Sequence, residues 1–191
     1  MSVKEKWNDR YRDAANEIAS AAYVLQENHH LLPEKGVALD LACGRGGNAI
    51  LLAQHGLQVH AWDISDVVIE TLQQQVKKLS LPVTTEVRDI ELKPPEAEQF
   101  DVIVVSYFLE RNIMQALVSA LKPGGLIFYQ TFIQERVSDR GPQRDAFRLG
   151  RQELLQLFSE LDVIIYREEG LIGNTTTGLR DEALFVGRKP G

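Results

Sequence analysis

Residues 37–49, which read V-A-L-D-L-A-C-G-R-G-G-N-A, constrain the fold more than any other stretch of the chain. The first five residues are a short apolar run that fits a buried strand. The glycines that follow allow a tight turn, in which the backbone can approach a ligand closely. Residues 48–54 then read as a helix whose free N–H groups point back toward the turn. This order of strand, turn and helix predicts a nucleotide-type binding corner.

Strand-type and helix-type periods alternate after this corner. The expected strands are residues 37–41, 59–62, 83–87, 100–106, 126–132, 163–166 and 182–188, and the expected helices are residues 3–17, 21–30, 66–78, 112–121 and 151–157. Residues 100–106 are almost wholly apolar, which favours a central position in the sheet. The last two strands have no helix between them and should pair as an antiparallel hairpin. The sequence predicts an α/β fold with a doubly wound, mostly parallel, seven-stranded sheet and an antiparallel C-terminal hairpin.

The chain has 191 residues, which suits one domain with a sizeable core. We divide residues 1–191 into an N-terminal helical cap at 1–36, a cofactor-binding half at 37–132 and a substrate-side loop, helix and hairpin at 133–191. The 133–147 loop carries arginines, so it is either an acceptor-side lid that attracts an anion or a solvated loop. Residues 122–125, K-P-G-G, predict a turn before the fifth strand.

Charge and composition exclude several classes of partner. A net charge of −6 argues against a nucleic acid or an anionic membrane as the main partner. The single cysteine excludes an intramolecular disulfide, and one cysteine with four histidines argues against a structural zinc site. No apolar run approaches about 18 residues, and the N-terminus lacks the apolar core of a signal peptide. We therefore expect a cytoplasmic protein that acts without a membrane.

Three acids follow or lie in successive strands: Asp40, Asp63 and Asp89. Strand ends converge on one crevice in an open parallel sheet. Asp63 lies 63 − 44 = 19 residues after Gly44, close to the ~20 expected for an acid that binds a ribose diol. Asp89 is placed to meet the edge of a base, and Ile64 and Ile90 would supply apolar faces for its ring.

A dinucleotide site has to be weighed, because Gly44, Gly46 and Ala49 match G-x-G-x-x-A. Asp40 opposes it, since a carboxylate there would repel a pyrophosphate but attract an ammonium group. The chain also lacks room for a separate substrate domain and has no Y-x-x-x-K pair. These features oppose an NAD-linked reductase, but the glycine match keeps it as the alternative.

The motifs together resemble those of class I S-adenosylmethionine-dependent methyltransferases. D-L-A-C-G-R-G at 40–46 is similar to the family's D-x-G-x-G-x-G, and L-K-P-G-G at 121–125 matches a later motif. Asn48, the opening W-N-D-R-Y and the segment at 147–155 resemble the tellurite-resistance-type branch. Ala42 departs from the pattern, because the family usually has glycine there.

The resemblance implies a Rossmann-like fold, S-adenosyl-L-methionine as cofactor and S-adenosyl-L-homocysteine as product. It implies that Asp40 and the backbone of residues 42–44 hold the methionyl end, Asp63 the ribose and Asp89 the adenine. The full set of expected cofactor-binding residues is Tyr11, Asp40, Ala42, Cys43, Gly44, Asn48, Asp63, Ile64, Asp89, Ile90 and Ser106. Tyr11 belongs to the first helix, where Val3, Trp7 and Tyr11 share one face. This face either docks on the core or forms a flap over the cofactor.

The expected reaction is direct in-line methyl transfer to a small molecule such as a thiol, a metalloid oxyanion or another metabolite. Strand four ends in S-Y-F and lacks the N-P-P-Y of enzymes that methylate amide or exocyclic amino nitrogens. No catalytic residue can be assigned, although Glu110 or Glu135 would be available as a base. A non-catalytic S-adenosylmethionine-binding module is a further alternative. The sequence leaves open whether the protein is a monomer or a homodimer.

Overall fold

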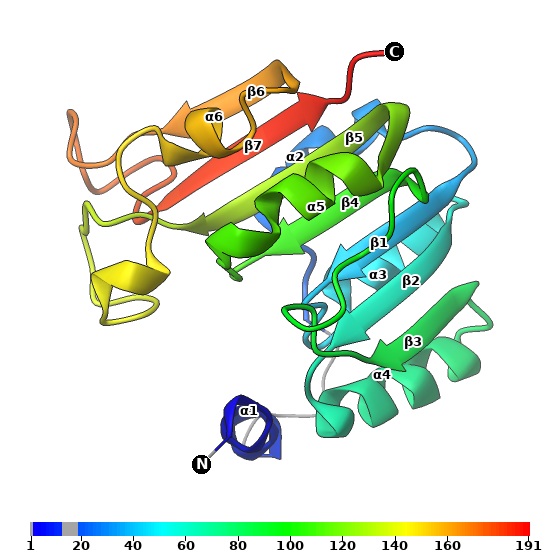
Figure 1. The fold of residues 1–191 in the computed structure, drawn as a ribbon. Coiled ribbons are helices and arrows are strands. Elements are labelled where there is room, and N and C mark those ends of the chain that lie inside the picture. Colours follow the sequence, from blue (N-terminus) through cyan, green and yellow to red (C-terminus); the bar gives the residue numbers. More distant parts are fainter. Residues whose placement is uncertain (1, 13–18) are drawn as a thin grey trace.

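A seven-stranded sheet forms the centre of the molecule in the computed structural model, which describes residues 2–12 and 19–191 (Figure 1). The strand order is β3-β2-β1-β4-β5-β7-β6. The strands are β1 (Val37–Leu41), β2 (Gln58–Asp63), β3 (Val83–Val87), β4 (Phe100–Ser106), β5 (Leu121–Phe132), β6 (Asp162–Glu168) and β7 (Glu182–Arg188). Strand β4 is central, as predicted, and four of its seven residues from Val102 to Val105 are fully buried.

The direction of the strands confirms the predicted fold class. Strands β3, β2, β1, β4 and β5 pair in parallel, and β7 runs antiparallel to both of its neighbours, β5 and β6. The order changes direction between β1 and β4, so the carboxyl ends of these two strands border the crevice where ligands bind in open α/β sheets.

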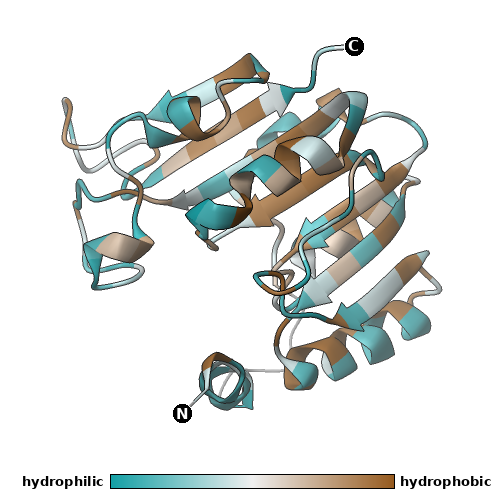
Figure 2. Cartoon of the chain, viewed as in Figure 1, coloured by the Kyte–Doolittle hydropathy of each residue, from teal (hydrophilic) through white to brown (hydrophobic). Residues whose placement is uncertain are grey.

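Helices and loops cover both faces of the sheet. The helices are α1 (Val3–Arg12), α2 (Tyr23–Asn28), α3 (Gly47–Gln54), α4 (Asp66–Lys78), α5 (Met114–Ala120) and α6 (Glu153–Leu157). Alternate residues of β1 and β4 enter opposite cores, because successive side chains of a strand point to opposite faces. Ala38 and Val104 pack on the side of α2, α3 and α4, whereas Leu39 and Ile103 pack on the side of α5 and α6. Figure 2 shows the apolar central strands and the mainly polar α1.

Some element boundaries and faces differ from the sequence prediction. The described part of the first helix ends at Arg12, and predicted residues 13–17 lie outside the described residues. Val3, expected on its buried face, is 59% exposed, whereas Asn8 is buried. Strand β5 begins at Leu121, so the expected turn at 122–125 is part of an irregular strand start. Helix α4 has the predicted bounds, and Ser65 caps its start, since the Ser65 hydroxyl accepts a hydrogen bond from Val68 N at 3.4 Å.

One buried arginine organises the loop at 133–147. Arg148 is fully buried and donates hydrogen bonds to the carbonyl oxygens of Ile133 (2.8 Å), Pro142 (2.7 Å) and Arg140. The loop is thus built around a guanidinium group, which satisfies carbonyls that no strand partner reaches.

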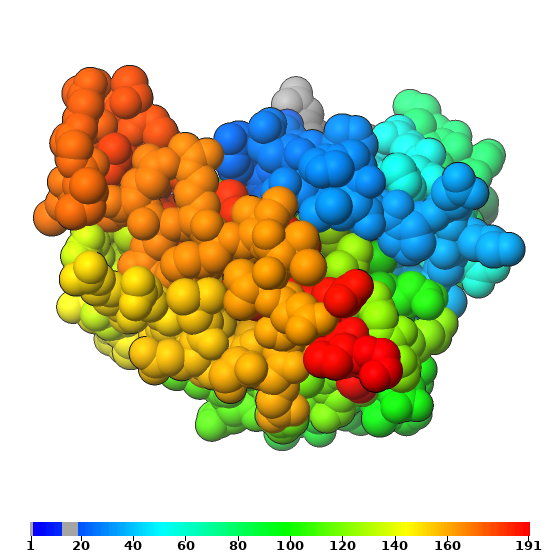
Figure 3. Space-filling model, turned by 90° about the horizontal axis from the view of Figure 1, so that it is seen from above, coloured from blue at the N-terminus to red at the C-terminus, as the bar shows by residue number. Residues whose placement is uncertain are grey.

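A second arginine shapes the loop between β6 and β7. Arg180 donates to the carbonyl oxygens of Gly170 (2.7 Å), Ile172 (2.9 Å), Asn174 (2.8 Å) and Thr177 (2.7 Å). This loop projects at one corner of the molecule (Figure 3). The segment around α2 lies beside β6, and Arg167 of β6 donates to the Tyr23 hydroxyl of α2 at 3.3 Å. No helix among the described residues is long and apolar enough to cross a membrane.

Replacing Arg148 by leucine should destabilise the fold strongly. Each buried carbonyl that loses its partner costs roughly 1–3 kcal/mol, so we expect Arg148→Leu to lower the free energy of unfolding by about 3 kcal/mol or more. Arg144→Leu, an exposed arginine of the same loop, is the matched control and should change it by less than about 0.5 kcal/mol. Urea unfolding of both variants measures this, and equal effects would contradict the organising role of Arg148.

Candidate functional site

The glycine turn after β1 has the tight geometry that its sequence predicts. Gly46 N donates to Cys43 O at 2.9 Å, and Cys43 N donates to Trp62 O at 2.9 Å, which extends the pairing of β1 with β2. Gly44 and Gly46 have φ angles of 49° and 76°, in the left-handed region that glycine enters without strain. Ala42 also lies in this region, with φ of 54°. Glycine would adopt this conformation at a lower cost, which explains why the family usually has glycine at this position.

Asp40 is a fully buried carboxylate inside β1. One oxygen accepts from Ala49 N at 3.0 Å and the other from Asn48 Nδ2 at 3.2 Å. Burial raises the pKa of Asp40 from 3.8 to about 8, although both hydrogen bonds oppose this rise. Because the side chain has no exposed surface, a ligand in the crevice would meet it through its charge and through Asn48.

Asn48 joins three segments at the start of α3. Its amide oxygen accepts from Ala22 N at 2.8 Å, and its amide nitrogen donates to both Asp40 and the Ser106 hydroxyl, the latter at 2.9 Å. The predicted residues Asp40, Asn48 and Ser106 are therefore in direct contact, at the carboxyl ends of β1 and β4.

Asp63 holds the other side of the glycine turn. Its two carboxylate oxygens accept from Gly44 N and Ser65 N, each at 2.9 Å. Asp63 is 5% exposed, and burial raises its pKa although these hydrogen bonds lower it. The donors in these contacts to Asp40 and Asp63 are neutral amides. These hydrogen bonds therefore bring no positive charge to the buried carboxyl groups at the two ends of the turn.

The predicted base-binding residues are less exposed to a ligand than expected. Asp89 is partly buried and accepts from Glu91 N at 3.1 Å and Leu92 N at 3.3 Å, so it also shapes the turn after β3. Ile90 is 5% exposed and packs in the same core as Trp62, whereas Ile64 is partly exposed. Ile64 is thus the more accessible of the two apolar residues.

Tyr11 lies over the glycine turn. A Cβ atom on Gly44 would lie 3.0 Å from the Tyr11 hydroxyl oxygen, which shows how closely the ring approaches the turn. Trp7 stacks on Tyr11 with ring centroids 5.8 Å apart. Burial, followed by the charge of Asp63, raises the pKa of Tyr11 above its usual value. Tyr11 also packs against the core on the side of α3 and α4, so its contacts fit both predicted alternatives for this face.

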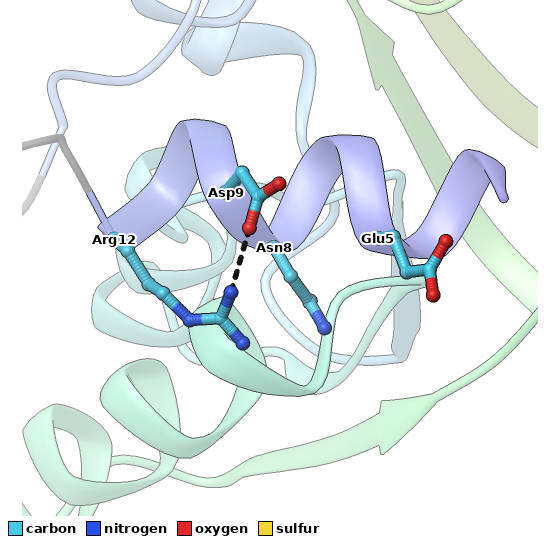
Figure 4. A pocket seen from close by; sticks show the side chains of 4 residues that line it. All are labelled: Glu5, Asn8, Asp9 and Arg12. Carbon is cyan, nitrogen blue, oxygen red and sulfur yellow. Dashed lines mark hydrogen bonds and ion pairs between the residues drawn. The ribbon is translucent and has the colours of Figure 1, made fainter. Parts of the chain in front are cut away.

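Sequence reasoning missed Asn8, which anchors α1 to the site. Asn8 is buried and its side-chain oxygen accepts from the Ser65 hydroxyl at 2.6 Å. A pocket lined by Glu5, Asn8, Asp9 and Arg12 lies on the same helix (Figure 4), with Arg12 paired to Asp9 at 2.7 Å. An asparagine on a polar helix gives no signal of burial, because its partner is 57 residues away in the sequence.

The residues considered as bases and as anion-attracting groups have other partners. Glu110 accepts from Asn112 N at 3.0 Å and caps the following turn, and Glu135 accepts from Leu171 N at 3.3 Å. In the 133–147 loop, Arg136 pairs with Asp145 and Arg140 pairs with Glu182 at 2.9 Å. These pairs offset the charges of Arg136 and Arg140, whereas the third arginine of the loop, Arg144, is exposed.

Comparisons with known proteins agree with this geometry. A family model described as a methyltransferase domain matches residues 38–125. The ubiquinone biosynthesis O-methyltransferase of Coxiella burnetii is 30% identical over 98 residues, which are 49% of this chain and 42% of that protein. The probable S-adenosyl-L-methionine-dependent methyltransferase TehB of Haemophilus influenzae is 27% identical over 139 residues, which are 68% of this chain and 47% of that protein. The chain thus spans less than half the length of these curated relatives.

Solved structures share the fold. The crystal structure of TehB from Haemophilus influenzae has a TM-score of 0.71 at 24% identity and covers 96% of this chain and 67% of that one. Geranyl diphosphate C-methyltransferase from Streptomyces coelicolor, in complex with S-adenosyl-L-homocysteine, has a TM-score of 0.73 at 13% identity and covers 99% and 98%. The comparisons confirm the resemblance to class I methyltransferases and to the TehB branch, and the predicted cofactor. They do not favour the NAD-linked alternative.

Asn48→Asp should make the stability of the protein depend steeply on pH. The new carboxylate would lie near Asp40. Two adjacent carboxylates repel each other once both are ionised, which happens as the pH rises. We expect the free energy of unfolding of Asn48→Asp to fall more than that of the wild type as pH rises from 6 to 9. Urea unfolding at both values measures this, and parallel curves for the two proteins would contradict the contact between residues 40 and 48.

Proposed function

We propose that this chain transfers a methyl group from S-adenosylmethionine to a small-molecule acceptor by direct in-line displacement. One observation carries the proposal. Asp40 and Asp63 are buried at the two ends of a glycine turn, with raised pKa values and neutral donors. A cationic ligand beside such a turn offsets the cost of burying these groups. A sulfonium cofactor with an ammonium group at one end and a ribose diol at the other has that character.

The proposed roles follow the positions of the residues. Asp40 attracts the ammonium group through its charge, while Asn48 and Ser106 meet the methionyl end. Asp63 accepts hydrogen bonds from the ribose hydroxyls, Ile64 and Ile90 flank the adenine, and Asp89 meets its edge. The backbone of residues 42–44 lines the turn and Tyr11 closes over it. Residues 37–132 would therefore form the cofactor-binding half, and residues 133–191 with the cap at 1–36 the acceptor side.

The protein's part in the reaction is alignment. The cofactor supplies the activated methyl group when it is bound. Asn48 fixes Ser106 relative to Asp40, and Tyr11 covers the turn, so the site is organised before a ligand arrives. Alignment of a nucleophile with a bound reactant is worth an effective molarity on the order of 10⁵–10⁸ M. This accounts for catalysis without a dedicated metal ion or a covalent intermediate on the protein.

Asp63→Asn should weaken the binding of S-adenosylmethionine. The substitution removes the charge that strengthens hydrogen bonds from the ribose, and a loss of ~1.4 kcal/mol is a factor of ten in Kd. We expect Kd to rise about tenfold or more by isothermal titration calorimetry. Glu70→Gln, an exposed acid of α4, is the matched control and should leave Kd unchanged. No binding by the wild type would overturn the proposed function.

Cofactor affinity should rise with pH because of Asp40. A bound cation lowers the pKa of a carboxyl within ~4–6 Å by ~1–3 units, so binding favours the ionised form and releases a proton. The pKa of Asp40 is about 8 in the free protein, and affinity should therefore increase as pH rises from 6 to about 7.5, below the ~7.7–8.0 at which the α-amino group of the cofactor loses its charge. We expect a gain of about threefold or more over this range.

Calorimetry in two buffers of different ionisation enthalpy measures the proton released. Asp40→Asn is the control, because it removes the titrating group and should flatten the pH dependence. An affinity in the wild type that is independent of pH would contradict a cation near Asp40.

A further inference from the structure

Two backbone N–H groups hold the Asp63 carboxylate in place. Gly44 N donates to its Oδ2 atom and Ser65 N donates to its Oδ1 atom, each at 2.9 Å. An ionised carboxylate accepts hydrogen bonds at roughly four lone-pair sites, so these donors also set the direction of the sites that a ribose would use. The orientation of Asp63 therefore depends on how firmly Gly44 and Ser65 are held.

Helix α1 contacts both of the residues that carry these N–H groups. The Asn8 side-chain oxygen accepts from the Ser65 hydroxyl at 2.6 Å. The Tyr11 hydroxyl lies so close to Gly44 that a Cβ atom there would be 3.0 Å from it. Asn8 and Tyr11 are three positions apart, and residues at this spacing share one face of a helix. One face of α1 thus reaches both of the residues that donate to Asp63.

The bond between Asn8 and Ser65 is buried. Asn8 is 7% exposed and Ser65 has no exposed surface, so water does not readily replace this bond when it is lost. The Ser65 hydroxyl donates its one proton to Asn8 and accepts from Val68 N at 3.4 Å, so contacts with α1 and α4 both fix its rotation. Ser65 is therefore held from two sides, and one of them is α1.

A second link between α1 and α4 provides a comparison. Lys4 pairs with Asp66 at 2.7 Å, and the two side chains are 43% and 42% exposed. Exposed ion pairs contribute little to stability, because water and salt screen the two charges. This pair joins α1 to Asp66, whereas Asn8 joins α1 to a residue that donates to Asp63. The two links therefore allow the docking of α1 to be separated from the orientation of the carboxylate.

We infer that α1 braces the ribose-binding carboxylate, and that Asn8, through Ser65, and Tyr11, through Gly44, are positioning residues for Asp63. The inference rests on the proposed methyltransferase function. Coupling between two sites is reciprocal, so a docked α1 strengthens cofactor binding by the same factor by which the bound cofactor stabilises the docked α1. The N-terminal cap thereby contributes to affinity at the ribose through the two donors of Asp63.

The test is a double-mutant cycle in the dissociation constant of S-adenosylmethionine, measured by isothermal titration calorimetry. We expect Asn8→Ala to raise Kd about fivefold or more, within the range that such cycles find for residues in one hydrogen-bond network. In Asp63→Asn, where the ribose contact is already weakened, the same substitution should change Kd by less than about twofold. Lys4→Met is the matched control, and it should also change Kd by less than about twofold.

A second measurement requires no substitution in α1. Saturating the wild type with S-adenosylmethionine should slow amide hydrogen exchange in residues 3–12, and the slowing should be smaller in saturated Asp63→Asn. An unchanged Kd in Asn8→Ala, an equal rise with and without Asp63→Asn, an equal rise in Lys4→Met, or unchanged exchange in α1 would each overturn the inference. Failure of the wild type to bind S-adenosylmethionine would instead overturn the proposed function on which it rests.

Discussion

The burial of Asp40 is the constraint on which the rest of the site depends. A carboxylate without exposed surface in the middle of a sheet is costly unless donors surround it. Asn48 and the N–H of Ala49 supply those donors, and both belong to the helix that the glycine turn begins. The same asparagine binds the backbone of Ala22 and the hydroxyl of Ser106. One buried charge thereby fixes the relative positions of β1, α3, β4 and the segment before α2.

Two of the six described non-glycine residues with positive φ lie near this site. Ala42 and Tyr107, with φ of 54° and 57°, end β1 and β4 where these neighbouring strands reach the crevice. Neither residue is glycine, so the backbone of each is strained, and the surrounding contacts must offset the strain energy. The strain at Tyr107 accompanies the hydrogen bond from its phenol to Glu182, whereas the strain at Ala42 accompanies a turn where the family pattern has glycine.

Local sequence patterns predicted most of the fold, because strand period, helix caps and the spacing of Gly44 and Asp63 are local features. The bounds of α4 and the antiparallel pairing of the last two strands are examples. The sequence did not predict contacts between distant polar residues. Asn8 with Ser65, and Gln130 with Glu182, join residues 57 and 52 positions apart, and each looks like an ordinary surface residue in its own segment. Arg148 likewise reads as a loop charge, although it is the buried centre of its loop.

The proposed function places Asp40 and Asp63 at the two ends of one bound cofactor. A crystal structure of the protein with S-adenosylhomocysteine would show whether they lie there. We expect the amino group on the side of Asp40, Asn48 and Ser106, and the ribose hydroxyls within hydrogen-bond distance of the Asp63 carboxylate. A ligand bound in the opposite direction, or in the pocket beside Glu5 and Asn8, would contradict it.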